Sequence, residues 1–243
     1  MDTPGPGLKR IENNRSLTQR AVESVREAIH NGTLQPGELY SVYKIAEDLG
    51  VSRSPVREAM LRLEETGLVR FERNKGFRVV FPGPQELAEM IAVRIALEVP
   101  AARRAAARYS AGAEVDVRLH QEWRAMKAAA ELDDERLFIH HDQRLHGIIL
   151  ELAGSAYVHR IVENLRDATR LVGASTIRGS RNLQRVYAEH TPIVEAILAG
   201  NVEDAGEAMD FHLRETGRIL LQDAIERDGS MFDLATLWAR LID

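Results

Sequence analysis

The chain has 243 residues, of which 44% are hydrophobic and 28% charged, and its formal net charge is −5 at pH 7. That length suits one large domain or two modest ones with hydrophobic cores of their own. Because there is no cysteine, disulfides, thiolate metal sites and cysteine nucleophiles are excluded, and a metal site would have to use histidine and carboxylate ligands.

No signal for export or membrane insertion stands in the sequence. The opening residues lack the basic-then-apolar order of a signal peptide, and no run approaches the roughly 20 apolar residues of a membrane helix. We therefore expect a cytoplasmic protein with no membrane partner, and a flexible tail over residues 1–15. Residues 1–80 hold 13 Lys and Arg against 11 Asp and Glu, whereas residues 81–243 hold 19 against 26, so the basic excess lies in the first third.

Residues 41–63 have the pattern of a helix-turn-helix. Ser41 to Leu49 can form a short helix, and Gly50 suits the left-handed position that ends one. Ser52 is a good N-cap for a second helix. The apolar stripe of that helix, at spacing i, i+3, i+4 and i+7, consists of Val56, Ala59, Met60 and Leu63. The residues that project away from the stripe, and would enter the DNA major groove, are Arg53, Ser54 and Arg57.

Two short strands are expected next, over Val69 to Glu72 and Gly76 to Val80. They are joined by a basic turn, Arg73-Asn74-Lys75-Gly76, which is placed to reach the DNA backbone or the minor groove. Together these elements predict a winged helix-turn-helix domain.

The region from about 16 to 80 resembles a known family of domains. The resemblance is carried by the stretches Gly32 to Leu39, Val51 to Ala59 and Gly67 to Val69. This region is similar to the amino-terminal domain of GntR-family bacterial transcription regulators. The resemblance implies contacts with double-stranded operator DNA from Ser52, Arg53, Ser54, Arg57, Asn74, Lys75 and Gly76. One departure lies in the preceding helix, where Tyr43 and Lys44 occupy a stretch in which some members carry an acidic residue and an arginine.

Pro82-Gly83-Pro84 is the clearest boundary, because two prolines around a glycine stop the last strand and suit the start of a helix. We expect a winged helix-turn-helix domain over 16–81, a linker over 82–84 and an all-helical effector-binding and dimerisation domain over 85–243. Helices are expected near 84–109, 113–131, 133–153, 155–178, 181–199, 201–227 and 230–242, with breaks at Gly112, Gly154, Gly179 and Gly200. The predicted fold is therefore mainly α, with an antiparallel bundle after the winged helix.

Four polar residues stand in apolar stripes of this bundle. Asp142 and His146, spaced i, i+4, lie on one helix, and His190 and His212 lie on two later ones. Burying an unpaired polar side chain costs about 1–3 kcal/mol, so these residues need partners. One divalent cation would serve all four, and neutral imidazoles with one carboxylate suit zinc as first choice, or nickel, iron or manganese. Taken singly, each histidine is more readily explained as a hydrogen-bonded core or surface residue than as a ligand, and only the joint pattern favours a metal site.

The bundle also resembles a known domain, the ligand-sensing C-terminal domain of the FadR-like branch of GntR regulators. The matching stretches are Arg94 to Glu98, Asp142 to His146, His190 to Ile197 and Ala208 to Leu213. In metal-binding members, the counterparts of Asp142, His146, His190 and His212 hold the cation and a small carboxylate often completes its coordination. Arg94 is the expected carboxylate partner, because its planar guanidinium binds two oxygens at once; an i, i+4 ion pair with Glu98 is the alternative.

The expected protein is a transcriptional regulator that binds a two-fold operator as a homodimer and responds to a small organic acid, most simply as a repressor. One alternative is a constitutive DNA-binding regulator whose metal only stabilises the bundle. The other is a His/Asp metal hydrolase attached to a DNA-binding domain, although no residue is forced into the role of general base.

Overall fold

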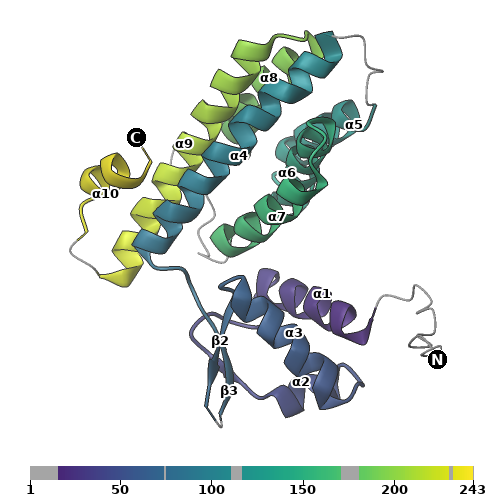
Figure 1. The fold of residues 1–243 in the computed structure, drawn as a ribbon, viewed down its shortest axis with the longest axis vertical. Coiled ribbons are helices and arrows are strands. Elements are labelled where there is room, and N and C mark those ends of the chain that lie inside the picture. Colours follow the sequence, from purple (N-terminus) through teal and green to yellow (C-terminus); the bar gives the residue numbers. More distant parts are fainter. Residues whose placement is uncertain (1–15, 74, 111–116, 171–180, 230–231, 243) are drawn as a thin grey trace, which may run out of the picture. The chain divides into compact units, whose positions relative to one another are not determined.

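The computed structural model describes residues 16–73, 75–110, 117–170, 181–229 and 232–242 (Figure 1). Contacts divide the chain into one unit of residues 1–65 and 69–79 and a second unit of residues 66–68 and 80–243. The predicted tail over 1–15, the wing residue Asn74 and the predicted breaks at Gly112 and Gly179 lie outside the described residues.

The first unit is a winged helix-turn-helix, as the sequence predicted. Its three-stranded antiparallel sheet has the order β1-β3-β2. Two elements were missed at the sequence level, the first helix and a two-residue strand that pairs with β3. In chain order the elements are α1 (Leu17–His30), β1 (Leu39–Tyr40), α2 (Val42–Asp48), α3 (Arg53–Glu65), β2 (Val69–Glu72) and β3 (Gly76–Val79).

Local chemistry explains the helix-turn-helix. The Ser41 side chain caps α2 by accepting a hydrogen bond from the Tyr43 backbone N–H, and Gly50 ends the turn with a φ of 66°. The predicted stripe of α3 is fully buried, at 0% exposure for Val56, Ala59, Met60 and Leu63. The missed helix α1 packs against α3, and Thr18 Oγ1 donates to Glu58 Oε2 at 2.9 Å between them.

The second unit is an all-helical bundle, also as predicted. The helices α4 and α9 lie side by side along most of their length, and α5 packs on α6 (Figure 1). Asp134 caps α6 and Asn182 caps α8 through their side-chain oxygens. The helices are α4 (Pro84–Ser110), α5 (Val117–Glu131), α6 (Glu135–Leu152), α7 (Ala156–Arg170), α8 (Leu183–Leu198), α9 (Val202–Asp228) and α10 (Leu234–Leu241).

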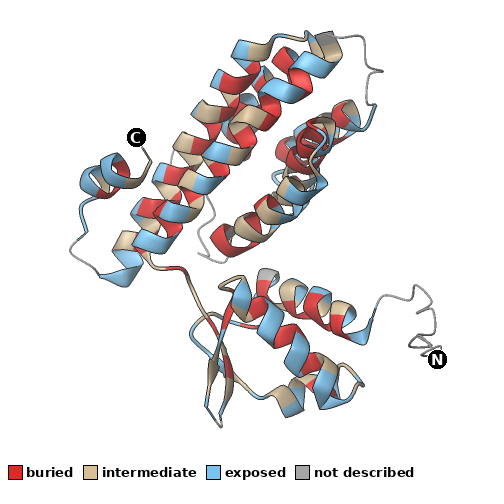
Figure 2. Cartoon of the chain, in the orientation of Figure 1, coloured by how far each residue is buried: buried red, intermediate tan, exposed pale blue. Residues whose placement is uncertain are grey.

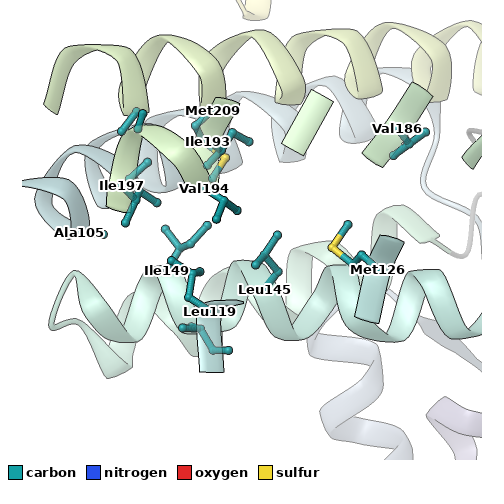
Figure 3. Packing of buried hydrophobic residues seen from close by; sticks show 14 of the residues in the cluster. Ala105, Leu119, Met126, Leu145, Ile149, Val186, Ile193, Val194, Ile197 and Met209 are labelled. Atoms are coloured by element: carbon teal, nitrogen blue, oxygen red, sulfur yellow. The ribbon is translucent and has the colours of Figure 1, made fainter. Parts of the chain in front are cut away.

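The core of the bundle is built from one buried face of each long helix (Figure 2). In the second half of α4 that face is made of alanines, among them Ala101 and Ala105, which let neighbouring helices approach closely. Leucine, isoleucine and methionine side chains of α6, α8 and α9 interlock opposite it, as Figure 3 shows for Leu145, Ile149, Ile193 and Met209. None of the helices in the described part of the chain is both long and apolar enough to cross a membrane.

Candidate functional site

The predicted DNA-contacting residues of α3 all face solvent. Ser52 precedes the helix, and Arg53, Ser54 and Arg57 are exposed in its first turns. In the wing, Lys75 is exposed with 68% of its side chain accessible, and Gly76 begins β3. The unit therefore presents a cationic helix end and a cationic hairpin, the two features that reach a duplex in winged-helix proteins.

The side chain of Arg57 contacts strand β2 of the wing. Its guanidinium carbon lies 5.6 Å from the centroid of the Phe71 ring on β2, a cation–π distance. The backbone N–H of Phe71 in turn donates to Glu64 Oε1 of α3 at 2.8 Å. Helix α3 and strand β2 of the wing therefore contact each other directly beside Arg57, the residue predicted to contact DNA bases.

The four predicted metal ligands come together inside the second unit. One ligand atom from each of Asp142, His146, His190 and His212 lies within 4.8 Å of all the others. The Nε2 atom of His190 is 2.9 Å from Asp142 Oδ1 and 3.3 Å from His146 Nε2, and the rings of His190 and His212 have centroids 4.0 Å apart. All three histidines are almost completely buried, whereas Asp142 keeps 15% of its side chain accessible.

Each imidazole has an acceptor on its Nδ1 side. His146 Nδ1 lies 2.5 Å from Glu98 Oε2, His190 Nδ1 lies 2.8 Å from the Val186 carbonyl oxygen, and His212 Nδ1 lies 3.3 Å from Glu189 Oε2. Such acceptors receive a hydrogen bond from the Nδ1–H group, which favours the tautomer whose Nε2 lone pair is free to bind a metal ion. This is the usual arrangement around histidines that bind a metal ion through Nε2.

Three buried ion pairs surround the cluster. Arg94 Nε contacts Glu98 Oε1 at 2.7 Å, so the ion pair offered as the alternative role for Arg94 is the arrangement present. Arg166 donates to Asp142 Oδ2, and its Nη1 lies 3.8 Å from Glu98 Oε2. Arg181 donates two hydrogen bonds to Glu189, from Nε to Oε1 at 3.1 Å and from Nη2 to Oε2 at 2.5 Å. Each carboxylate that orients or joins the cluster is therefore paired with its own arginine.

Burial and these pairs shift the pKa values in the direction that metal binding requires. Burial, helped by Arg166, lowers the pKa of His146 to about 4 despite the opposing effect of Glu98. Burial and then His190 hold the pKa of His212 well below its ordinary value. Burial would raise the pKa of Asp142, but Arg166 and His190 outweigh it and keep that pKa well below its usual value. At neutral pH, His146 and His212 are therefore neutral and Asp142 is ionised, which are the coordinating forms.

The donor set fits one divalent cation. Three imidazole nitrogens and one carboxylate oxygen are the ligands preferred by zinc and its neighbours in the first transition row. Around a tetrahedral zinc ion with bonds of about 2.0–2.2 Å, two ligand atoms lie about 3.3–3.6 Å apart. The ligand atoms that lie up to 4.8 Å apart would therefore have to approach one another by about 1 Å when such an ion binds.

A groove of about 310 Å³ lies between α6 and α7, and the four cluster residues are not in its lining. Its lining is rich in cationic and titratable side chains, including Arg118, Arg144 and His159, and Arg166 belongs to both the groove and the cluster. The Arg166 side chain is only 8% accessible. Arg166 lines the groove, while its Nε atom is buried and has no hydrogen-bond partner among the described residues.

Sequence reasoning missed the residues around the candidate metal ligands. Glu98 was considered only as a partner of Arg94, and neither Glu189 nor the arginines at 166 and 181 were assigned a role. The available signal was charge at buried helical positions, since Glu98 lies one turn after Arg94 and Glu189 precedes a ligand directly.

Comparisons with known proteins give the family. The model for the bacterial regulatory proteins of the gntR family matches residues 17–79, and the model for the FCD domain matches residues 89–215. The chain belongs to the GntR family and carries an FCD domain.

Relatives of this GntR-family chain are regulators over nearly their whole length. A probable D-xylose utilization operon transcriptional repressor from Paenarthrobacter nicotinovorans is 33% identical over 207 residues, covering 82% of this chain and 89% of that protein. The transcriptional repressor RspR of Escherichia coli is 26% identical, covering 85% and 90%. The solved structure of E. coli McbR/YncC has the same fold, with a TM-score of 0.71 at 22% identity over 85% of this chain and 98% of that chain.

The family assignment decides between two classes of function. GntR proteins are transcriptional regulators that bind operator DNA, so the chain is a regulator and not an enzyme. The metal hydrolase considered from the sequence is thereby excluded.

Proposed function

We propose that this GntR-family regulator is a repressor whose affinity for its operator changes when a small carboxylate binds beside a metal ion in the FCD domain. The observation that carries the proposal is the convergence of three imidazoles and one carboxylate, with a hydrogen-bond acceptor beside the Nδ1 atom of each ring. Repression is favoured because two of the relatives are named as repressors. A cytoplasmic location follows, since operator DNA lies there.

In this proposal the winged helix reads the operator. Arg53 and Arg57 approach base edges in the major groove, while Ser52 and Ser54 bond the phosphate backbone near the start of α3. The wing residues Asn74, Lys75 and Gly76 approach the backbone or the minor groove. One such helix reads only a few base pairs, so a homodimer on two half-sites supplies the discrimination a genome requires.

The metal site would be held by Asp142, His146, His190 and His212, with zinc as first choice and nickel, iron or manganese as the other candidates. When bound, the ion supplies a positive centre to which a carboxylate oxygen binds. The protein residues hold the ligand atoms in place. Glu98 and Glu189 orient His146 and His212, and Arg166 fixes the second oxygen of Asp142.

For the effector carboxylate we propose Arg166 as the first protein contact. It lies at the groove between α6 and α7 and has an unused Nε donor, whereas Arg94 already contacts Glu98 through Nε. A contribution from Arg94 remains part of the proposal, because it shares Glu98 with Arg166. An effector alters DNA binding only through a difference in its affinity for two arrangements of the protein, so it must stabilise one arrangement over the other.

The test is metal analysis combined with DNA binding. Wild-type protein and the His146→Ala/His212→Ala double variant would be purified in parallel, and bound metal measured by elemental analysis. We expect close to one divalent ion per wild-type chain and a large loss in the double variant. Equal metal content in both proteins would overturn the assignment of the cluster.

Operator binding would be measured with a duplex that the wild-type protein selects from a random pool. A screen of small carboxylates on the metal-loaded protein should find compounds that change the affinity for this duplex. A full set of carboxylates without effect on either affinity or melting temperature would instead favour the constitutive regulator, whose metal only stabilises the bundle.

A further inference from the structure

The charges around the cluster indicate the net charge of the effector, and not only that it is a small carboxylate. We infer that the ligand of this site carries two negative charges, as a dicarboxylate does at neutral pH. The inference rests on the proposed function above, because it takes a divalent cation at the cluster as its starting point.

The ionised side chains of the site balance one to one. Glu98 pairs with Arg94, Asp142 with Arg166, and Glu189 with Arg181. All six are shielded from solvent, with Asp142 the most accessible at 15% of its side chain. Because these three ion pairs are buried, water and salt screen their charges much less than they screen charges on the surface.

The imidazoles add no charge to it. An imidazole that binds a cation through Nε2 is neutral, with its single proton on Nδ1. The oxygens beside the three Nδ1 atoms, on Glu98, Val186 and Glu189, are placed to accept a hydrogen bond from that N–H, so the proton stays on the ring. The side chains of the site therefore sum to zero charge.

A divalent ion then leaves two uncompensated positive charges in a buried volume. An unbalanced buried charge is costly, because the low-dielectric interior replaces its hydration poorly. A monocarboxylate would cancel one of the two charges and a dicarboxylate both. Arg166 adds a second anchoring point, since it lines the groove and also contacts Asp142 of the cluster.

The experiment compares anions of equal shape and different charge. Metal-loaded full-length protein would be unfolded thermally with succinate or its monoamide succinamate, and with malonate or its monoamide malonamate. Each diacid and its amide have nearly the same size, but the diacid carries one more negative charge. We expect an apparent affinity, from the shift in melting temperature, about tenfold or more higher for at least one diacid than for its amide. Metal content after each titration would exclude removal of the ion by the diacid.

Metal-stripped protein is the first control. Its site has no excess positive charge, so the preference for the diacid should disappear. A preference of equal size without metal would overturn the inference, because it would arise from general attraction to arginines.

Two matched variants give a second control. Arg166→Gln removes one buried positive charge from the site and should reduce the diacid-to-amide preference. Arg144→Gln removes the same charge at a groove position with 54% side-chain exposure and should leave the preference nearly unchanged. Equal loss in both variants would also contradict the inference.

The outcomes separate this inference from the proposed function. If the amides bind as tightly as the diacids, the charge argument is wrong while carboxylate sensing stands. If none of the four compounds shifts the melting temperature of metal-loaded protein, carboxylate sensing itself fails together with the inference.

Discussion

Glu98 Oε2 lies 2.5 Å from Nδ1 of His146, so a carboxylate of α4 fixes the ring of a candidate metal ligand on α6. Both residues are 1% exposed, and the same carboxylate receives Arg94 through its other oxygen. The first helix of the FCD domain thus contributes no metal ligand to the cluster and still controls the orientation of one.

Replacement of this carboxylate should weaken metal binding without removing a ligand. In Glu98→Gln we expect the metal affinity to fall by roughly 10–100-fold, because an amide is a poorer acceptor for the Nδ1 proton of His146. The measurement is competition against a chelator of known affinity, with circular dichroism to verify the helical fold. Glu89→Gln, an exposed position on the same helix, is the control and should bind metal like the wild type. Unchanged affinity in Glu98→Gln would remove the proposed orienting role.

Arg57→Ala should lower operator affinity. If Arg57 makes a bidentate base contact, the loss is about 1–3 kcal/mol of binding free energy and specificity relaxes at the contacted position. Gel shifts at several salt concentrations on a duplex selected by the wild-type protein would measure both effects. Arg185→Ala removes the same charge from an exposed position in the helical domain and should bind DNA normally. If Arg57→Ala binds the duplex as tightly as the wild type at moderate salt, Arg57 does not make the predicted base contact.

The local parts of the fold were predictable because they follow from periodicity and caps. The apolar stripe of α3 is buried as its spacing indicated, and Gly50 has the left-handed backbone expected of it. The same signals exist in α1, where Ser16 caps the helix and Val22 and Ile29 are buried, so its omission was a failure to apply them. Strand β1 is different, because two residues carry no periodic pattern and pairing with β3 alone makes them a strand.

The candidate metal ligands were predictable only in part from the residues themselves. The i, i+4 spacing places Asp142 and His146 on one face of a helix, whereas their approach to His190 and His212 depends on how three helices pack. The resemblance to the FCD domain supplied that step. Glu98 and His146 are 48 positions apart in sequence, and Asp142 and Arg166 are 24 apart, so no local pattern announces either pair.

Glu122 should stabilise the second unit in a pH-dependent way. Burial would raise its pKa, but the hydrogen bonds to His141 and Arg144 outweigh burial and lower the pKa below its ordinary value of 4.5. A carboxyl whose pKa is lower in the folded state stabilises the fold above the unfolded pKa and loses that effect as pH falls through the folded pKa.

Glu122→Gln should therefore be less stable than the wild type by about 1 kcal/mol at pH 7, with the difference shrinking toward pH 3. Chemical unfolding at a series of pH values would measure it. Glu131→Gln, whose partner Lys127 lies 3.9 Å away on the exposed side of the same helix, should show little difference at any pH. A Glu122→Gln deficit that is independent of pH would contradict the role of its ionised form.

Gly76 was expected to contact DNA, and the structure gives it a separate task within the wing. Its φ is 131°, a conformation that residues with a side chain rarely adopt, and a Cβ there would lie 2.1 Å from the Tyr40 carbonyl oxygen of β1. Because that neighbour is backbone, it cannot move aside without breaking the pairing of β1 with β3.

Gly76→Ala should therefore destabilise the winged helix by about 1–3 kcal/mol and weaken DNA binding indirectly. Gly83→Ala is the matched control, since a Cβ at that position meets nothing within 4 Å. Thermal unfolding and gel shifts on the same samples separate the two tasks of Gly76. A variant that unfolds like the wild type and binds DNA poorly would assign Gly76 to the DNA interface alone, whereas parallel losses in stability and binding support the packing role.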